Sequence, residues 1–516
     1  MTHAASATTA TVSADKSAQA QPKNNVPLVF ACLMLGMLMS SLGQMIFSTA
    51  LPTLVGELGG VDKMSWVITI FLLTMTIGMP VYGKLGDQMG RKPLYIVAIV
   101  LFLTGSIIGA LAQDMNWMIA ARGVQGLGAG GLMIGAQAII ADVVSARDRG
   151  RYMGIMGAVF GLSSVLGPLL GGFFTDGPGW RWALWFNVPL AVITLLMVIF
   201  NLKLPKRGTG AHLDIPGTVL MAGATSSLIL LLTWGGRDYA WTSPVIIGLI
   251  IATVVFGAAL VLVERRTKDP LIPMGLFRVR NFTLTTVAGV ITGIVMFGTL
   301  AYLPTYIQMV HGMSPTKAGL MMIPMMAGMI LTSTTAGQYV SRTGRYKWFP
   351  VAGLLIAAAA TFLMGGFTAH DSLWHLGVVL ALMGVGLGLT MQLLVLIVQN
   401  AFPISMVGTA TATNNFFRQI GGAAGSAIVG SLFTHRLGDM IAERMPAEYT
   451  AGMSGGTSHN LTPDLVQTLP AAAKEAIVTS YNDALTPVLA ALAPAVIIAA
   501  IILSFVRQDN LRETID

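Results

Sequence analysis

Charged residues are scarce in this sequence: they make up 10% of its 516 residues, whereas 54% carry hydrophobic side chains. A soluble globular domain has about 25% charged residues, so the composition excludes an ordinary water-soluble protein. The apolar runs are long and unbroken, which excludes an outer-membrane β-barrel, whose strands are alternating segments of roughly 10 residues. Helices that cross a lipid bilayer remain, because a helix satisfies its backbone hydrogen bonds internally.

Cysteine and catalytic motifs are also missing. Cys32 is the single cysteine, so no intrachain disulfide can form. The sequence contains no metal-ligand spacing, phosphate-binding loop or nucleophile–base arrangement, and we expect neither an enzyme nor a bound metal or cofactor. The formal net charge of +8 would suit a nucleic-acid partner in a soluble protein. In a chain that crosses lipid it indicates topology, and we expect no nucleic-acid partner.

Apolar segments between charged breaks predict an all-α membrane protein with 14 transmembrane helices. Lys and Arg gather in the tails and in alternate connections, so the positive-inside rule places both termini in the cytoplasm. The expected location is the plasma membrane of a bacterium, the inner membrane, crossed many times by the chain. The predicted spans are 28–50, 64–83, 94–112, 115–141, 151–175, 183–202, 216–235, 243–263, 281–307, 316–340, 349–368, 373–399, 406–433 and 486–506.

A short pattern occurs twice and predicts two repeated halves. GKLGDQMGRK (83–92) follows span 2, and GQYVSRTGRYK (337–347) follows span 10. Both place glycine, Gly-Arg and a second base on the cytoplasmic side. The predicted domains are a disordered cytoplasmic tail (1–25), a six-helix bundle (26–205), two linker transmembrane helices with a cytoplasmic connector (206–280), a second six-helix bundle (281–506) with an extracytoplasmic loop (434–485), and a cytoplasmic tail (507–516).

The loop after span 2 combines turn-forming glycines with Asp87, Arg91 and Lys92. This arrangement resembles the signature cytoplasmic loop of the major facilitator superfamily, with Gln88 in place of the base that usually follows the acid. In that family the loop latches two halves together, its acid near a helix N-terminus and its arginine paired with an acid at the end of span 4, a position that Asp142 occupies here. The alternative is that these charges only enforce topology.

Span 4 carries a buried cation, Arg122, in the stretch ARGVQGLGAGG (121–131). A charged side chain within a span is costly, so such residues mark substrate or proton pathways more often than not. A structural role is the alternative: Arg122 would bond carbonyls and Gln125 and lock helices together.

Span 5 contains the stretch GIMGAVFGLSSVLGPLLGG (154–172), which resembles the motif of drug antiporters. WRWALWFNVP (180–189) further resembles the 14-span drug:proton antiporter subgroup. The resemblance implies a major facilitator fold, two six-helix bundles plus two extra helices, that exports lipophilic compounds by alternating access with proton influx. Generic helix packing by small residues is the alternative. The motif residues are Gly161, Gly167, Pro168, Gly171 and Gly172.

The acid that the family usually carries in span 1 is absent. The family has a sequence like Leu-Asp-x-Thr before Ala-Leu-Pro, whereas this chain reads SLGQMIFSTALP (41–52), with Gly43 and Met45 at the matching positions. Every Asp and Glu falls in a tail, a loop or a span end, and Asp142 is the acid nearest the membrane interior. Proton coupling is therefore left open, with Asp142 as the replacement site. An uncompensated positive cavity disfavours organic cations.

The predicted function is export of small lipophilic molecules, multidrug efflux type, across the lipid bilayer. The alternative is a dedicated exporter of a lipid or secreted metabolite with atypical or absent proton coupling, which hands cargo to an extracytoplasmic partner at 434–485; a flexible loop is the other interpretation of that segment. Predicted substrate contacts are Gln44, Arg122, Gln125, Gln308, Gln392 and Asn415, and predicted coupling or gating residues are Asp142, Arg122, Asp87, Arg91 and Arg418.

We predict that Gly43→Asp, which restores the family's acid, widens transport toward lipophilic cations, because a carboxylate offsets the positive potential of the cavity. The measurement is uptake of cationic and anionic dyes into inverted vesicles. An unchanged preference for substrate charge would count against this interpretation.

Overall fold

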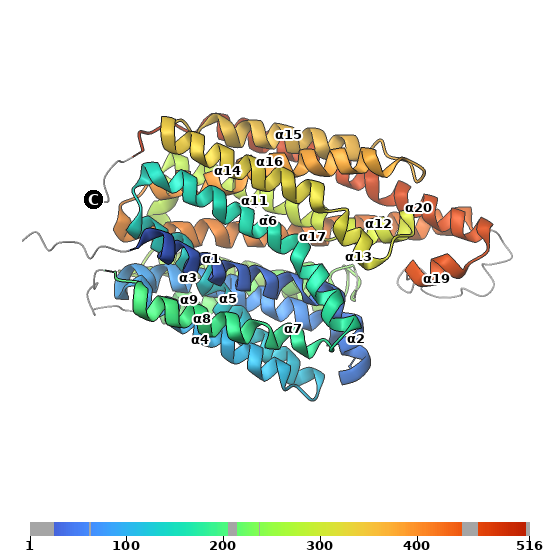
Figure 1. Ribbon diagram of the computed structural model, residues 1–516, viewed down its shortest axis with the longest axis horizontal. Coiled ribbons are helices and arrows are strands. Elements are labelled where there is room, and N and C mark those ends of the chain that lie inside the picture. Colours follow the sequence, from blue (N-terminus) through green and yellow to red (C-terminus); the bar gives the residue numbers. More distant parts are fainter. Residues whose placement is uncertain (1–24, 61–62, 205–213, 237, 446–462, 512–516) are drawn as a thin grey trace, which may run out of the picture.

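The computed structural model describes residues 25–60, 63–204, 214–236, 238–445 and 463–511. Long helices run nearly parallel to one axis (Figure 1). They form two groups that lie side by side, α1 to α8 in one and α11 to α21 in the other, and α6 of the first group packs against α14 of the second. Both chain ends leave at the same end of the molecule, called here the basic end, on the left of Figure 1. The predicted tail 1–25 lies outside the described residues except for Asn25.

Three long helices of the N-terminal half begin with a proline or a polar cap, α1 with Pro27, α5 with Asp114 and α6 with Ser145. Asp114 accepts a hydrogen bond from Trp117 N at the start of α5, and Ser145 caps α6 in the same way through Asp148 N. Pro168 lies inside α6. The helices are α1 (Val26–Met45), α2 (Phe47–Leu58), α3 (Met64–Met89), α4 (Arg91–Ala110), α5 (Met115–Val143), α6 (Ala146–Asp176), α7 (Arg181–Trp185) and α8 (Asn187–Asn201).

The first span of each half is broken into two helices. Met45 and Phe47 flank a break between α1 and α2, and Leu300 and Leu303 flank one between α11 and α12. The helices are α11 (Arg280–Leu300), α12 (Leu303–His311), α13 (Pro315–Leu320), α14 (Ile323–Thr343), α15 (Trp348–Met364), α16 (Leu373–Asn400), α17 (Val407–Arg444), α19 (Pro463–Thr468), α20 (Ala471–Ala490) and α21 (Ala493–Ser504), with 3-10 turns η2 (Met274–Arg278) and η3 (Ile404–Met406).

Two helices lie between the halves in sequence, α9 (Ile215–Trp234) and α10 (Pro244–Glu264). They pack on each other, and α9 also packs on α3 of one half and α17 of the other. Only 6% of the most apolar stretch of α10 is buried in the protein, so its side chains face lipid. The linker pair therefore touches both halves while standing outside them.

The all-α membrane fold predicted from composition is confirmed. Among the described residues, 12 helical segments are long and apolar enough to cross a membrane. The 17-residue α15 is shorter. The 38-residue α17 contains many polar residues. The number of 14 spans therefore stays a prediction.

Much of the predicted extracytoplasmic segment 434–485 is helical. α17 continues to Arg444, and α20 starts at Ala471, so the two helices extend beyond the other spans on the right of Figure 1. Arg444 donates to Asp483 Oδ2 over 2.7 Å and joins them. The apolar run ends at Phe433 because the following residues are polar, and a criterion based on hydropathy therefore ended the span too early. Residues 446–462 lie outside the described part of the chain.

The two halves meet through glycine-rich backbones. α3 packs on α17 and α6 packs on α14. A methyl group built on Gly83 of α3 would lie 2.4 Å from Ala412 Cβ and 2.7 Å from Gly408 O, both of α17. On the other pair, Ser333 Oγ of α14 donates to Gly154 O of α6 over 2.9 Å. Any larger side chain at Gly83 would push the halves apart at the basic end.

We predict that Gly83→Val separates α3 from α17, because the added side chain has no space. Spin labels at the exposed residues Met89 and Ser405 should report a longer distance at the basic end than in the parent. Gly257→Val is the matched control, since a methyl group there meets nothing within 4 Å. Equal label distances in the two variants would contradict the interface described above.

Candidate functional site

Asp87 joins the two halves at the basic end by capping α17. Its Oδ1 accepts from Gly408 N over 3.1 Å, and its Oδ2 accepts from Thr409 N over 2.7 Å and from Thr409 Oγ1 over 2.9 Å. These N–H groups belong to the first turn of α17, where the helix dipole favours a negative charge. The capping carboxylate comes from α3, in the opposite half.

Arg91 is the centre of the same cluster. It pairs with Asp87 Oδ1 at 2.9 Å and with Asp142 Oδ1 at 2.8 Å, and it donates to Ile404 O over 2.9 Å. The side chains of Arg91, Asp87 and Asp142 are at most 6% exposed. The structure thus brings together the three charged residues that the sequence placed in one latch, and it adds the carbonyl of Ile404 from the other half.

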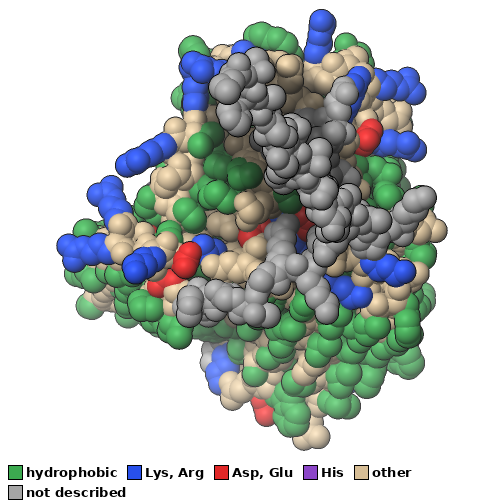
Figure 2. Space-filling view, turned by 90° about the vertical axis from the view of Figure 1, so that its left-hand side faces the viewer, with side chains coloured by type: hydrophobic (Ala, Val, Ile, Leu, Met, Phe, Trp, Pro, Cys, Tyr) green, Lys and Arg blue, Asp and Glu red, His purple; other side chains and the backbone are tan. Residues whose placement is uncertain are grey.

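A second cross-connection comes from the first turn of α6. Arg147 Nη2 donates to Arg342 O over 3.1 Å and its Nε donates to Ser341 O over 3.3 Å, at the C-terminal end of α14. Arg149 donates to Ala141 O and so caps α5 of its own half. Lys and Arg side chains surround the face of the molecule at this end (Figure 2).

Arg122 is fully buried and its partners are neutral. Its guanidinium donates to Gly43 O over 2.9 Å, to Val67 O over 3.2 Å and to Gln125 Oε1 over 2.6 Å. The rings of Phe47 and Phe71 lie 4.4 and 4.0 Å from its central carbon. At the position of the acid that the family usually carries in span 1, the backbone carbonyl of Gly43 accepts from Arg122 instead. Arg122 thus links α1, α3 and α5.

The Gly43 position has limited space for a new side chain. A Cβ there would lie 3.1 Å from Phe102 Cζ. The ring of Phe102 must shift to admit a carboxylate, so Gly43→Ala is the steric control for Gly43→Asp.

A polar cluster spans the halves on the side of the bundle nearer the basic end. Asn415 Nδ2 of α17 donates to Gln137 Oε1 of α5 over 2.9 Å, and Gln399 Nε2 of α16 donates to Gln137 O over 3.0 Å. Arg418 donates to Asn415 Oδ1. All four side chains are buried. Gln137 was missed in the sequence because it stands alone among apolar and small residues, and only its three-dimensional partners mark it.

The remaining predicted substrate residues do not gather at one point. Gln392 of α16 faces α6, where its Cγ lies 2.8 Å from a Cβ built on Gly157. Gln44 of α1 is partly buried. Gln308 Nε2 donates to Pro304 O within its own helix, α12. The predicted substrate set therefore divides into the pair Arg122 with Gln125, Asn415 beside the predicted gating residue Arg418, and separate glutamines.

The predicted antiporter motif lies along α6 against two neighbours. A Cβ built on Gly161 would lie 3.3 Å from Met329 Sδ of α14. A Cβ built on Gly167 would lie 2.5 Å from Met45 Cβ of α1. Gly171 is buried, and at Gly172 a Cβ would meet nothing within 4 Å. The stripe allows close contact on one side of the helix and leaves the other side open.

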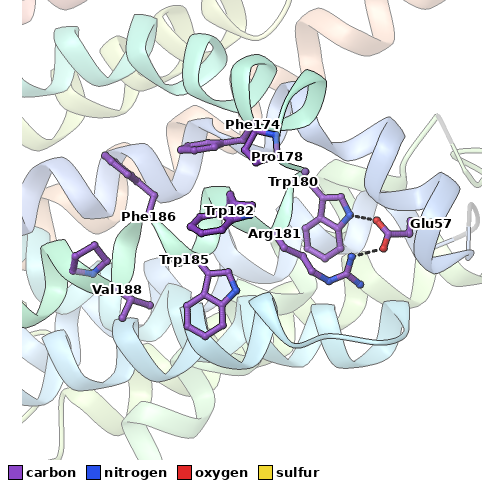
Figure 3. A pocket seen from close by; sticks show the side chains of 11 residues that line it. Glu57, Phe174, Pro178, Trp180, Arg181, Trp182, Trp185, Phe186 and Val188 are labelled. Atoms are coloured by element: carbon purple, nitrogen blue, oxygen red, sulfur yellow. Dashed lines mark hydrogen bonds and ion pairs between the residues drawn. The ribbon is translucent and has the colours of Figure 1, made fainter.

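An aromatic cavity of about 730 Å³ lies at the end opposite the basic end. Trp180 Nε1 donates to Glu57 Oε2 over 2.6 Å, and Arg181 pairs with the other oxygen of Glu57 (Figure 3). Trp182 and Trp185 line the space beside them. Every lining residue comes from the N-terminal half, so this cavity is not enclosed between the halves and is distinct from the Arg122 and Arg418 clusters.

Comparison with protein families matches residues 33–426 to the Major Facilitator Superfamily model. The chain belongs to this superfamily. It is a membrane transporter that crosses the bilayer many times, in a family of transporters rather than enzymes. Family membership rests on the matched sequence, and the two helical halves agree with it.

Related proteins include transporters with assigned names. The chain is 32% identical over 502 residues to the multidrug transporter protein MdtP of Bacillus subtilis, covering 93% of each chain. It is 34% identical over 414 residues to multidrug resistance protein 3 of the same organism, covering 80% of this chain and 81% of that one. An uncharacterized MFS-type transporter of Mycobacterium tuberculosis is 38% identical over 457 residues, which are 89% of this chain and 66% of that protein's length.

Solved structures support the fold. The human organic anion transporter MFSD10 superposes with a TM-score of 0.64 at 17% identity, covering 93% of this chain and 100% of that one. The proton:xylose symporter XylE superposes with a TM-score of 0.62 at 15% identity, covering 95% of this chain and 98% of that one.

We predict that Arg122→Lys lowers the thermal stability of the purified transporter, because an ammonium group cannot reach three acceptors on separate helices. The expected loss is about 1–3 kcal/mol, measured by thermal unfolding in detergent. Arg266→Lys on the exposed surface is the control. Unchanged stability with lost transport would show that Arg122 acts on the substrate and does not lock helices.

Proposed function

We propose that this transporter exports lipophilic small molecules and prefers neutral or anionic ones. Two buried cations within the spans, Arg122 and Arg418, carry this proposal. Among the described residues neither forms an ion pair with an acid, and Arg122 Nη2 and Arg418 Nη1 are buried without a hydrogen-bond partner. Unsatisfied donors on a charged group in a low dielectric attract an anionic or acceptor-rich ligand and repel cations.

Export is supported by the relatives, two of which carry multidrug names at 32% and 34% identity. Transport then proceeds by alternating access, with the two halves rocking around a site between Arg122 and Arg418. The basic end faces the cytoplasm, because Lys and Arg are retained there. Opening toward the cytoplasm requires Asp87 to leave the N-terminus of α17 and Arg147 to leave α14.

Proton coupling through Asp142 is part of the proposal. Protonation of Asp142 removes one of the two carboxylates that hold Arg91, so the contact between Arg91 and Ile404 O of the other half is weakened. Proton binding at this end would then favour opening of the latch. Arg122 itself cannot release a proton in the physiological range.

The test is transport in proteoliposomes with an imposed pH gradient. We expect the parent to move an anionic dye faster than a cationic dye of similar size, and Asp142→Asn to lose acceleration by the gradient while it still binds the anionic dye. Asp439→Asn is the matched control, since the Asp439 side chain is 71% exposed. Gradient-driven transport that survives in Asp142→Asn would exclude this acid as the proton site, and faster transport of the cationic dye would refute the charge preference.

A dedicated lipid or metabolite exporter is a second candidate, favoured by the helical extension of α17 and α20. Asn482 of α20 donates to Phe367 O over 2.8 Å and accepts from Tyr306 over 2.8 Å, so the base of this extension is fixed to the C-terminal half. A fixed extension can present a docking surface to a partner on the far side of the membrane. In the same assay, a variant without residues 446–462 should keep dye transport if the first candidate holds.

A further inference from the structure

Two acids at the basic end are buried, although both fall just outside the predicted spans. Asp214 is 8% exposed and Glu264 is 2% exposed. Asp214 precedes α9 and accepts from Gly217 N through Oδ1 over 2.9 Å. Glu264 ends α10 and accepts from Ile272 N through Oε2 over 3.1 Å. Each carboxyl group therefore uses one oxygen to fix a turn.

The remaining carboxyl oxygens of these two acids lie beside the same small space. Asp214 Oδ2 and Glu264 Oε1 are both buried without a hydrogen-bond partner among the described residues. A methyl group built on Gly217 would lie 2.4 Å from the first and 2.9 Å from the second, so both oxygens border the same point beside this glycine. The missing Cβ of Gly217 is what allows the two carboxyl groups to converge.

The surroundings of the pair offer little compensation for two negative charges. Met221, Leu271, Ile272 and Phe416 form a buried apolar cluster next to it. The charged groups that act on Glu264 are Asp214, which opposes its negative charge, and Lys84 of α3, which favours it, while Leu271 and Ile272 present backbone N–H groups. The charged residues that follow Glu264 in the connector, at 265, 266, 268 and 269, are exposed.

We propose that Asp214 and Glu264 form a proton-binding site in which one proton is shared between Oδ2 and Oε1. A single proton converts two unsatisfied acceptors into a donor and an acceptor, and it removes one of two charges in an apolar space. A metal ion fits less well, because Ca²⁺ requires six to eight oxygen ligands and Mg²⁺ near-octahedral geometry. No group of three or more metal-ligating side chains is found in the described residues. The site is separate from Asp142 and does not depend on the export proposal.

The site lies where it can sense the state of the latch. Glu264 holds the connector through Ile272 N, and the connector residues Leu271 and Ile272 share a cluster with Phe416 of α17 and with Ile77 and Val81 of α3. α3 and α17 are the helices that close the basic end. Loss of the proton leaves two carboxylates facing each other, which drives the start of α9 away from the end of α10 and loosens the connector against both helices.

Infrared spectroscopy of the purified full-length protein tests the site. At about pH 7, far above the ordinary range for carboxyl groups, we expect a carbonyl band from a protonated carboxyl that shifts in heavy water. The band should be lost in the double variant Asp214→Asn/Glu264→Gln and kept in Asp439→Asn. A parent protein without the band, or a double variant that keeps it, would overturn the proposal.

Thermal unfolding supplies a second readout that needs no transport. The melting temperature of the parent should fall by several degrees as the pH rises above the ordinary carboxyl range, because the unfolded chain then releases a proton that the folded pair keeps, and it should level off once the pair loses that proton. In the double variant both side chains are uncharged at all these pH values, so its melting temperature should fall less. Addition of Na⁺, Mg²⁺ or Ca²⁺ should leave the parent's band and melting temperature unchanged. Loss of the band with a stabilising cation would identify a metal site and refute the shared proton, and this result on the parent stands even if the double variant fails to fold.

Discussion

The carboxylate of Asp87 at the first turn of α17 is the contact on which closure of the basic end depends. A helix N-terminus has free N–H donors that need partners, and here a side chain from the opposite half supplies them. Arg91 then holds Asp87 in place from its own half and reaches Ile404 O in the other. Because the anion and its cation are both buried, separation of the halves must expose or reorganise the entire network.

The same bundle keeps two arginines in its interior, and neither forms an ion pair with an acid in the described part of the chain. Neutral oxygens accept from both arginines: Gly43 O of α1 accepts from Arg122 of α5, and Asn415 Oδ1 accepts from Arg418 within α17. Neutral acceptors orient a guanidinium and leave its charge uncancelled. The interior electrostatic potential is therefore positive around these two arginines, and the acids described above lie nearer the ends of the molecule.

The sequence predicted the structure well where a residue type is stable in only one kind of environment. Long apolar runs predicted the spans, and the spacing around Asp87 and Arg91 predicted a cluster that the fold does assemble. Prediction failed where environment depends on distant partners: the polar continuation of α17 past Phe433 rests on α20, Gln137 has meaning only beside Asn415, and the burial of Glu264 requires the connector to fold back. None of these contacts leaves a periodic signal in the chain.

The glycines along α6 and α14 make the interface between the halves smooth, because little side chain projects from either helix there. Gly150, Gly154 and Gly337 put bare backbone against backbone, where most helix pairs interlock side chains. Surfaces without interlocking knobs can tilt or slide over each other with few rotamer changes. If the halves rock as proposed, this interface separates and re-forms without repacking a core of interlocked side chains.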